Sequence, residues 1–227
     1  MKTRFAVAMS ACSLLAAGCA TKDATSPQTQ AGVRIVNAYG QPVDVLVDGA
    51  LAVAGVPPGV DTVPQSAGNH TVTLRAAGVT TSGVPVTIAT GAVATVAAVR
   101  WGSVLAAAAF GDTNAVVPSG ATKVRVLHLA PNAGEIQVFR TQPDWGTPIE
   151  WQFPFLYDSV LTDPLAHPYL QSTVGTWEVR AWRKPSEVGL GWAGTTAHVT
   201  FNLASGQKRT VLVLDKAGGG IELSVID

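Results

Sequence analysis

Charged residues are scarce in this chain, and their scarcity excludes several classes of ligand. Only 13% of the 227 residues are charged, and 15 Lys and Arg residues balance 15 Asp and Glu residues, so the formal net charge at pH 7 is zero. Proteins that bind nucleic acid present a basic field, and proteins that bind anionic lipid present clustered Lys and Arg. The charges here are scattered instead. The sequence therefore predicts no nucleic-acid partner, and no glycine-rich loop between a strand and a helix indicates a nucleotide.

Cysteine is equally rare, and its placement excludes an internal disulfide. The chain has two cysteines, Cys12 and Cys19. Cys12 lies inside an apolar segment that we expect to be removed, so Cys19 would remain as the only cysteine. An exported protein with one cysteine near its start uses that thiol for something other than a disulfide.

Long apolar runs are also lacking, because the one candidate lies at the N-terminus and is short. Lys2 and Arg4 flank the start of an apolar stretch from Phe5 to Ala17, which is too short to cross a bilayer as a helix. A basic start followed by a short apolar run is typical of a cleaved export signal. We therefore predict a signal peptide over residues 1–18.

The end of this leader, Leu15-Ala16-Ala17-Gly18-Cys19, resembles the lipobox of bacterial lipoproteins. In that motif the cysteine is acylated and becomes the first residue of the mature protein. The commonest form has Leu three places before the cysteine, where this chain has Ala16. The alternative is an ordinary secretory signal cut near Gly18 or Ala20, which leaves Cys19 removed or as a lone thiol.

Lipidation of Cys19 would hold the protein at a membrane without a hydrophobic helix. Each buried methylene of a fatty chain contributes roughly 0.8 kcal/mol, and more than one chain gives stable anchoring. Residues 19–31 have no apolar periodicity beyond the cysteine and are expected to form a flexible tether. Ala20 rather than Asp after the cysteine favours the outer membrane. The sequence thus predicts an exported, lipid-anchored protein of the bacterial cell envelope.

The remaining sequence has the composition and periodicity of an all-β protein. It is rich in Val and Thr, which suit a pleated, half-buried surface. Apolar residues alternate with polar ones, and turn signals recur at intervals of about ten residues, the spacing of a sandwich or barrel. Residues 93–100 and 104–110 are expected to form an alanine-rich hairpin that is thinly packed or paired against bulkier neighbours. The alternating sets include Val33 and Ile35, then Val43, Val45 and Val47, then Val72 and Leu74.

After Pro118-Ser119-Gly120 the chain starts again. Residues 124–128 (Val-Arg-Val-Leu-His) repeat residues 33–37 (Val-Arg-Ile-Val-Asn), and residues 136–139 repeat residues 43–46. Duplication of one module is the economical explanation. We expect a first β-sandwich over residues 32–117 and a second, richer in aromatic residues, over residues 118–227.

The two openings resemble a known family. Residues 33–49, which end in Val-Asp-Gly, and residues 124–139 resemble the opening strands of the domain-of-unknown-function 4397 family. The resemblance implies exported bacterial proteins, often with tandem copies, that have immunoglobulin-like or transthyretin-like β-sandwich folds and no assigned activity. The family's His after the first strand is matched by His128, whereas Asn37 replaces it in the first copy. The Val-Asp-Gly turn is lost in the second copy, where residues 140–142 are Arg-Thr-Gln. The resemblance transfers no catalytic residue.

The chemically reactive side chains do not form a recognisable catalytic or metal site. The four histidines are dispersed, and none has a partner four residues away as in a helical zinc motif. By strand parity His128 shares a face with Val124 and Val126, which predicts a half-buried histidine bonded to the backbone. Neither a Gly-x-Ser-x-Gly elbow nor a local carboxylate pair indicates a hydrolase or a glycosidase. We therefore predict a protein that is not an enzyme and has no catalytic residue, metal or cofactor, with a hydrolase of unrecognised pattern as an alternative.

The aromatic residues of the second module include one candidate stripe. Trp151, Phe153, Phe155 and Tyr157 share one face of an extended segment. Pro154 on the other face removes a ladder donor and predicts an edge strand. Such a row of rings could receive a sugar or a protein partner, but a core poor in Leu and Ile would also use these rings as bulk.

A second aromatic pair predicts an exposed tryptophan. Trp177 and Trp182 are five residues apart, so in a regular strand they face opposite sides of the sheet. Trp182 would share its side with Glu178 and Arg180, and an exposed Trp beside charges is typical of a contact with protein or carbohydrate. The candidate binding surface therefore comprises Trp182, Glu178, Arg180, Trp151 and Tyr157.

Taken together, these features predict a non-catalytic, lipid-anchored envelope protein with a binding or structural role. The alternative is a carbohydrate-binding surface protein that uses exposed aromatic residues of the second module. The expected partners are the membrane, through the N-terminal lipid, and an envelope protein or glycan.

Overall fold

The structure, a computed structural model, describes residues 31–111, 117–141, 149–155, 157, 167–183 and 197–226, and only the backbone of residues 149–155. Every regular element in these ranges is a β-strand, and the strands form two β-sandwich modules, which confirms the predicted fold class. The predicted leader, Cys19 and the tether up to residue 30 lie outside the described residues. In the described part of the chain, no helix is long and apolar enough to span a membrane.

The first module consists of two sheets. One has the strand order β4-β1-β8-β9; the other has the order β3-β2-β5-β6, with β7 also paired to β5. The strands of the first sheet are β1 (Gly32–Asn37), β4 (Gly59–Pro64), β8 (Val93–Trp101) and β9 (Val104–Phe110). Those of the second are β2 (Val43–Val47), β3 (Ala50–Val56), β5 (Gly68–Ala76), β6 (Val79–Thr80) and β7 (Val84–Ile88).

The second module also consists of two sheets, with the strand orders β13-β10-β16-β17 and β12-β11-β14-β15. The strands of the first are β10 (Ala121–His128), β13 (Leu170–Thr173), β16 (Lys208–Asp215) and β17 (Ile221–Ile226). Those of the second are β11 (Ile136–Thr141), β12 (Ile149–Phe155), β14 (Gly175–Arg183) and β15 (Ala197–Leu203). β12 pairs only with β11 among the described strands, so the predicted edge strand is confirmed.

The two modules share one strand arrangement. β1 pairs with β8 in parallel, and β10 pairs with β16 in parallel. The registers also correspond, because Arg34 lies opposite Thr95 and Arg125 lies opposite Thr210. Each module thus begins with the same strand in the same place, with an arginine at the same position of that strand.

Each module has its own apolar core, made by the predicted alternation. Val33 and Ile35 of β1, and Val72 and Leu74 of β5, all lie in the core of the first module. Full burial of such a side chain contributes roughly 1.5–3 kcal/mol, so the inward faces hold the sheets together. The sharp β2–β3 turn is possible because Asp48 and Gly49 adopt φ of 51° and 81°, the conformation of a two-residue hairpin turn.

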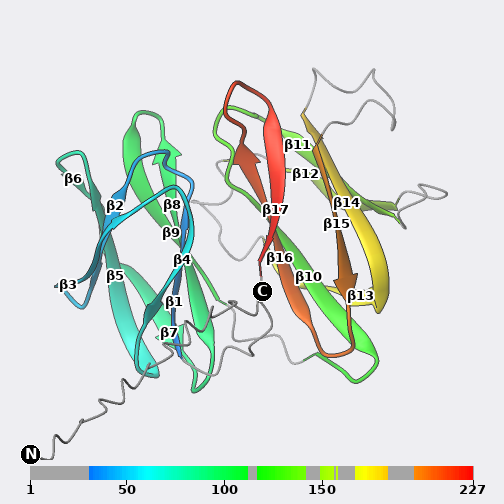
Figure 1. Cartoon of the computed structure of the whole chain (residues 1–227), viewed down its shortest axis with the longest axis horizontal. Coiled ribbons are helices and arrows are strands. Elements are labelled where there is room, and N and C mark those ends of the chain that lie inside the picture. The colour runs from blue at the N-terminus through cyan, green and yellow to red at the C-terminus, as the bar shows by residue number, and fades with distance from the viewer. Residues whose placement is uncertain are drawn as a thin grey trace, which may run out of the picture.

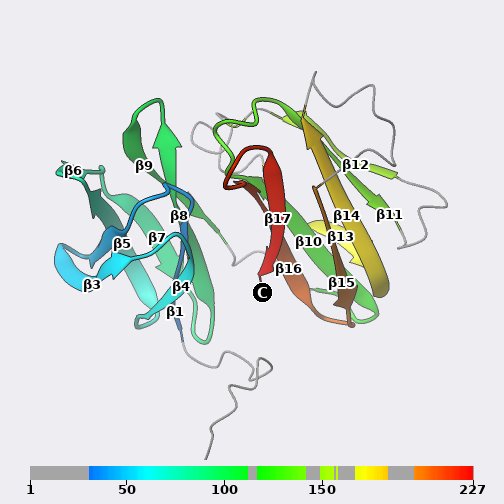
Figure 2. The same ribbon diagram turned by 45° about the horizontal axis from the view of Figure 1, so that its top comes forward.

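The two modules pack against each other through their β1-containing and β10-containing sheets, which lie side by side in both ribbon views (Figures 1 and 2). A third apolar cluster joins these sheets, and its buried side chains come from the faces opposite the module cores. β1 is therefore buried at all six positions rather than alternately. The cluster contains Val36, Ala97, Val99, Ala108 and Phe110 of the first module, and Leu127, Leu129, Tyr157 and Leu212 of the second.

The contact between modules explains the alanine-rich hairpin formed by β8 and β9. Ala97 and Ala108 lie opposite each other across this hairpin. Both belong to the same cluster as Leu127 and Leu212 of the second module. Small side chains on one sheet allow large ones on the other to approach at close-packed density. The predicted pairing of the hairpin with bulkier neighbours is thus confirmed.

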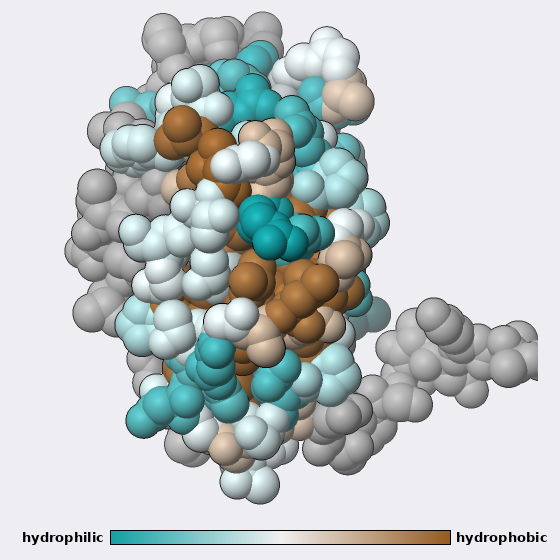
Figure 3. Space-filling model, turned by 90° about the vertical axis from the view of Figure 1, so that its left-hand side faces the viewer, coloured by the Kyte–Doolittle hydropathy of each residue, from teal (hydrophilic) through white to brown (hydrophobic). Residues whose placement is uncertain are grey.

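The outer sheet of the first module faces away from this contact (Figure 3). By register, Leu46 lies opposite Leu51 and Asp44 lies opposite Arg75. The Asp44 Oδ2 and Arg75 Nη2 atoms are 2.8 Å apart and form an ion pair. Apolar groups gather near the centre of this face, and polar groups lie above and below them (Figure 3).

Candidate functional site

Arg125 ties the two modules together. Its side chain is only 2% exposed. The Nε atom donates to Thr210 Oγ1 at 3.0 Å within the second module. The Nη1 and Nη2 atoms donate to Gly111 O at 3.3 Å and to Thr95 Oγ1 at 3.4 Å. A single guanidinium therefore bonds to both modules, and its fork geometry fixes their relative position.

Aromatic rings complete the surroundings of this guanidinium. The Arg125 Cζ atom lies 5.7 Å from the ring centre of Phe110 and 4.5 Å from that of Tyr169. Cation–π attraction is stronger where water is excluded, as it is here. A second hydrogen bond also joins the two modules, because Tyr157 Oη donates to Arg100 O at 2.5 Å. The interface is thus both apolar and specifically bonded.

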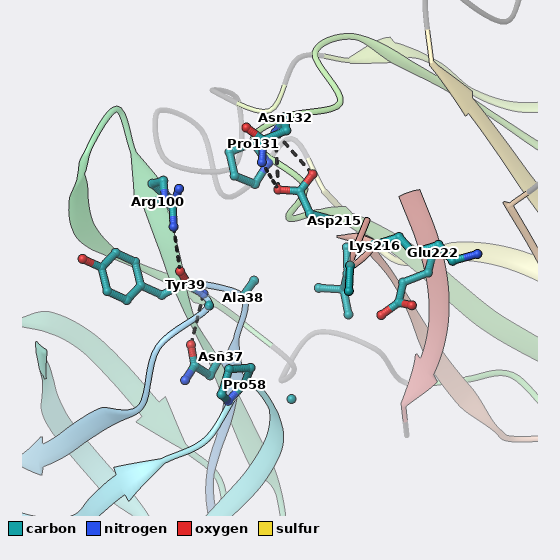
Figure 4. Close-up of a pocket in the computed structure, with 14 residues that line it drawn as sticks. Asn37, Ala38, Tyr39, Pro58, Arg100, Pro131, Asn132, Asp215, Lys216 and Glu222 are labelled. Atoms are coloured by element: carbon teal, nitrogen blue, oxygen red, sulfur yellow. Dashed lines mark hydrogen bonds between the residues drawn. The ribbon is translucent and has the colours of Figure 1, made fainter. Parts of the chain in front are cut away.

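A groove of about 460 Å³ opens between the modules (Figure 4). It lies where β1, β8 and β16 end, so its walls are the loops at one end of both sandwiches. Its volume is within the range of sites that hold small molecules or peptide side chains. The lining residues of the first module are Asn37, Ala38, Tyr39, Gly40, Pro58, Gly59 and Arg100, and those of the second are Pro131, Asn132, Leu214, Asp215, Lys216, Ala217 and Glu222.

The wall from the first module is a loop that Asn37 holds in place. The Asn37 Nδ2 atom donates to Gln41 O at 2.8 Å and to Val56 O at 2.9 Å. The Asn37 Oδ1 atom accepts from Tyr39 N at 3.0 Å. Arg100 then lies 5.9 Å from the Tyr39 ring centre, and its Nη2 atom donates to Tyr39 O at 3.4 Å. An exposed guanidinium is therefore fixed at the groove by a pinned loop.

The wall from the second module carries two carboxylates. Asn132 Nδ2 donates to Asp215 Oδ2 at 2.8 Å, and Asn132 N lies 3.3 and 3.4 Å from the two carboxylate oxygens. Burial raises the pKa of Asp215, while the bonds from Asn132 and the positive charge of Arg100 oppose that shift. Glu222 is exposed on β17 and directs its carboxylate toward the gap (Figure 4). The first module thus contributes the guanidinium of Arg100 to the groove, and the second contributes the carboxylates of Asp215 and Glu222 together with the exposed ammonium of Lys216.

His128 has a structural role within the second module. Its side chain is 0% exposed, its Nε2 lies 2.7 Å from Gly134 O, and its Nδ1 accepts from Ala130 N at 3.4 Å. These bonds require the proton on Nε2. Burial lowers the pKa of His128 to about 4. The predicted bond to backbone is confirmed, although the side chain is fully rather than half buried.

Trp182 is not exposed, and that expectation is wrong. Its side chain is 8% exposed, and its ring lies 4.6 Å from that of Phe139, centre to centre. The Trp182 Nε1 atom donates to Gln137 Oε1 at 2.8 Å. Gln137 is its direct cross-strand neighbour, so the adjacent strand β11 supplies both the ring contact and the polar partner. The strand parity was correct, because Trp177 faces the core of the module and Trp182 the other side.

Glu178 and Arg180 accompany Trp182 on that side, as predicted. Arg180 Nε donates to Glu178 Oε1, and Thr200 Oγ1 donates to Glu178 Oε2 at 3.4 Å. Glu178 is only 6% exposed. The two charges therefore neutralise each other on the sheet.

The two remaining members of the predicted binding surface lie elsewhere. Tyr157 is buried in the cluster between the modules and meets His128 edge to face, with ring centres 5.8 Å apart. Trp151 belongs to β12, and its side chain lies outside the described residues, as do those of Phe153 and Phe155. The structure thus does not bring the five predicted residues together.

The groove residues were missed from the sequence. Arg100, Asn132, Asp215 and Glu222 follow no shared motif, because the groove unites turns from distant segments. One indirect signal of the groove was present in the sequence. Asn37 and His128 end the first strand of their modules, and each bonds to the loop that follows that strand. Among the described residues, no group of three or more His, Cys, Asp or Glu side chains could hold a metal ion.

Residues 31–139 match the family model described as Domain of unknown function (DUF4397). The matched stretch contains the whole first module and continues through β10 into β11. No curated protein matches the chain. The predicted family resemblance is therefore confirmed for residues 31–139, over which this chain is similar to that family.

Proposed function

We propose that this protein is a non-catalytic, lipid-anchored component of the bacterial cell envelope whose two modules act as one rigid binding unit. Cys19 would carry the lipid and residues 19–31 would form the tether. The outer membrane is the favoured location, and an envelope protein or glycan is the expected partner. The two modules would hold their shared groove in a fixed shape for that partner.

The observation that carries this proposal is the bonded, apolar contact between the modules. Domains in one chain move relative to each other by default unless their interface is large and hydrophobic. Here a separate apolar cluster joins the sheets, and the buried Arg125 bonds to Thr95 and Gly111 across the contact. Fixed walls favour binding, because a preformed site loses less conformational entropy when it is occupied.

The buried polar groups support a structural use of the functional side chains. Arg125, His128 and Asn37 each hold a loop or a module in place through hydrogen bonds to backbone or hydroxyl groups. Residues used in this way are not positioned to act on a substrate. This distribution favours a scaffold for binding over a catalytic centre.

The shared strand order favours descent of both modules from one family domain. The parallel pairing of β1 with β8 recurs as that of β10 with β16, with an Arg opposite a Thr each time. We therefore infer that the second module is a diverged tandem copy of the first.

Anchoring is tested by following the full chain and its Cys19→Ser variant in a bacterial host. The full chain is expected to incorporate labelled fatty acid and to fractionate with membranes, whereas the variant should do neither. Cys12→Ser is the matched control and should leave both properties intact. Fatty-acid label that persists in Cys19→Ser would refute the anchoring part of the proposal.

A further inference from the structure

We propose that the groove between the modules binds an extended peptide segment that carries an acidic and a basic side chain close together. This inference deepens the proposed binding role and rests on the rigid packing of the modules. It does not depend on how the protein is anchored.

The first argument is the arrangement of charge. Arg100 presents an exposed guanidinium from the first module, while the second presents the carboxylates of Asp215 and Glu222 and the ammonium of Lys216, so two negative charges face one positive charge on that wall (Figure 4). Among the described residues, no ion pair joins the two walls. The field of Arg100 nevertheless acts on Asp215 across the groove. A ligand with one charge of each sign would complete both walls at once.

The second argument is the hydrogen-bonding capacity that remains at each wall. The Arg100 guanidinium donates one long hydrogen bond, from Nη2 to Tyr39 O at 3.4 Å. A guanidinium has five N–H donors and matches a carboxylate with two parallel bonds. On the opposite wall Asn132 engages Asp215, and Glu222 stays exposed on β17. A carboxylate of the ligand would thus bind at Arg100 and an ammonium or guanidinium group at Glu222.

The third argument is the lining between the charges. Ala38 and Pro58 of the first module and Leu214 of the second line the same groove. Their apolar surfaces suit aliphatic side chains or the stems of long charged ones. A neutral glycan would leave the guanidinium and the carboxylate without charged partners. The combination therefore favours a peptide segment over a sugar.

The test uses calorimetric titration of the purified full-length protein in detergent at low salt. The probes are the capped tetrapeptide Glu-Ala-Ala-Lys, its neutral counterpart Gln-Ala-Ala-Gln, and maltotriose as the carbohydrate arm. The charged peptide is expected to bind, and the neutral peptide at least about tenfold more weakly, because each charge-assisted hydrogen bond is worth at least that factor. The affinity for the charged peptide should also fall as added salt screens the charges.

Two variants locate the binding. Arg100→Gln and Glu222→Gln are each expected to weaken the charged peptide about tenfold or more. Arg75→Gln, which removes an exposed arginine from the outer sheet of the first module, is the matched control and should leave the affinity unchanged. Thermal unfolding of each variant checks that the fold is retained.

Three outcomes would overturn the inference. These are no binding of the charged peptide at millimolar concentration, equal affinity for the neutral peptide, and affinity unchanged in both groove variants. Binding of maltotriose that ignores the charge changes would instead assign the groove to a glycan. None of these results would alter the membrane fractionation of the Cys19→Ser variant, so failure of this inference is distinct from failure of the anchoring proposal.

Discussion

The two modules have the same strand order but fill equivalent positions with side chains of different size. Val36 lies opposite Ala97 in the first module, and Leu127 lies opposite Leu212 at the corresponding places of the second. All four side chains point into the contact between modules. The first module therefore offers a shallow surface and the second a bulky one.

This difference in side-chain size determines which faces can pack together. Two alanine-rich faces would leave cavities between them, and two leucine-rich faces would keep the sheets apart. One alanine-rich face and one leucine-rich face pack closely together. Because one face is shallow and the other bulky, each module fits the other better than it would fit a copy of itself.

The largest effect is expected from changing size at this contact. Leu212→Ala should destabilise the protein by about 2–5 kcal/mol, because it removes buried methyl groups and leaves a cavity. Ala97→Leu should cost about 1–3 kcal/mol through overpacking. Denaturant unfolding of both variants and of the double variant measures the coupling between the positions.

The double variant distinguishes complementarity from simple burial. If the two faces fit by size, the double variant Ala97→Leu, Leu212→Ala loses less unfolding free energy than the two single variants lose together. Strictly additive costs would show that the difference between the modules is not one of mutual fit.

His128 offers a pH-dependent comparison, because the equivalent residue of the first module is Asn37. Burial lowers the pKa of His128 to about 4 from its usual 6.5, a difference that corresponds to about 3 kcal/mol. The unfolded chain takes up a proton at this residue below pH 6.5, whereas the folded chain does so only near pH 4. Stability is therefore fully present above pH 6.5 and is lost as the pH falls through this window.

The variant His128→Asn, which places the residue of the first module in the second, should remove this contribution. Its unfolding free energy is expected to change less between pH 7 and pH 4 than that of the unaltered protein. The measurement is chemical unfolding at a series of pH values. An unchanged pH profile would assign the acid sensitivity to other groups.

A conservative change at Arg125 tests whether its bonds across the contact depend on the shape of the guanidinium. Arg125→Lys keeps the charge but cannot reproduce a fork that reaches Thr210, Gly111 and Thr95 together. Loss of one or two of these bonds should cost about 1–3 kcal/mol in the free energy of unfolding. Arg75→Lys, at an exposed arginine that forms a surface ion pair with Asp44, is the control and has a smaller expected cost. Equal costs for the two variants would contradict a special role for Arg125.

Much of the fold followed from periodicity. The alternation of Val33 with Ile35 predicted one buried face of β1, Pro154 predicted the edge strand β12, and parity separated Trp177 from Trp182. These are local properties, set by the pleat of a strand and by a missing N–H group.

The contact between modules and the groove did not follow, because they depend on surfaces that meet only in three dimensions. Nothing in the sequence around Arg125 shows that its side chain will be covered by another module. Similarly, the exposure expected for Trp182 neglected Gln137 and Phe139, which the register of β11 with β14 places beside it. Charge beside an aromatic residue was therefore a poor guide to exposure.

The smallest expected effect concerns a turn that only the first module retains. His70 Nδ1 lies 2.7 Å from Asp48 Oδ2, and His70 Nε2 lies 3.0 Å from Ser66 O. Because a carboxylate and a carbonyl can only accept, this geometry favours an imidazolium that carries both protons. The hydrogen bond to Asp48 is the main cause that raises the pKa of His70 above its usual value.

The resulting stabilisation is present below pH 6.5 and is lost as the pH rises through the raised pKa of His70, opposite in direction to that of His128. NMR titration of the ring protons of His70 measures its pKa in the folded protein. Asp48→Asn should lower the pKa of His70, whereas Asp44→Asn, which removes a carboxylate from the neighbouring strand β2, should leave it unchanged. The second module has Thr141 in the corresponding segment and lacks the Val-Asp-Gly turn, so it provides no equivalent of this pair. An unaltered titration in Asp48→Asn would show that the turn, rather than its carboxylate, sets the protonation of His70.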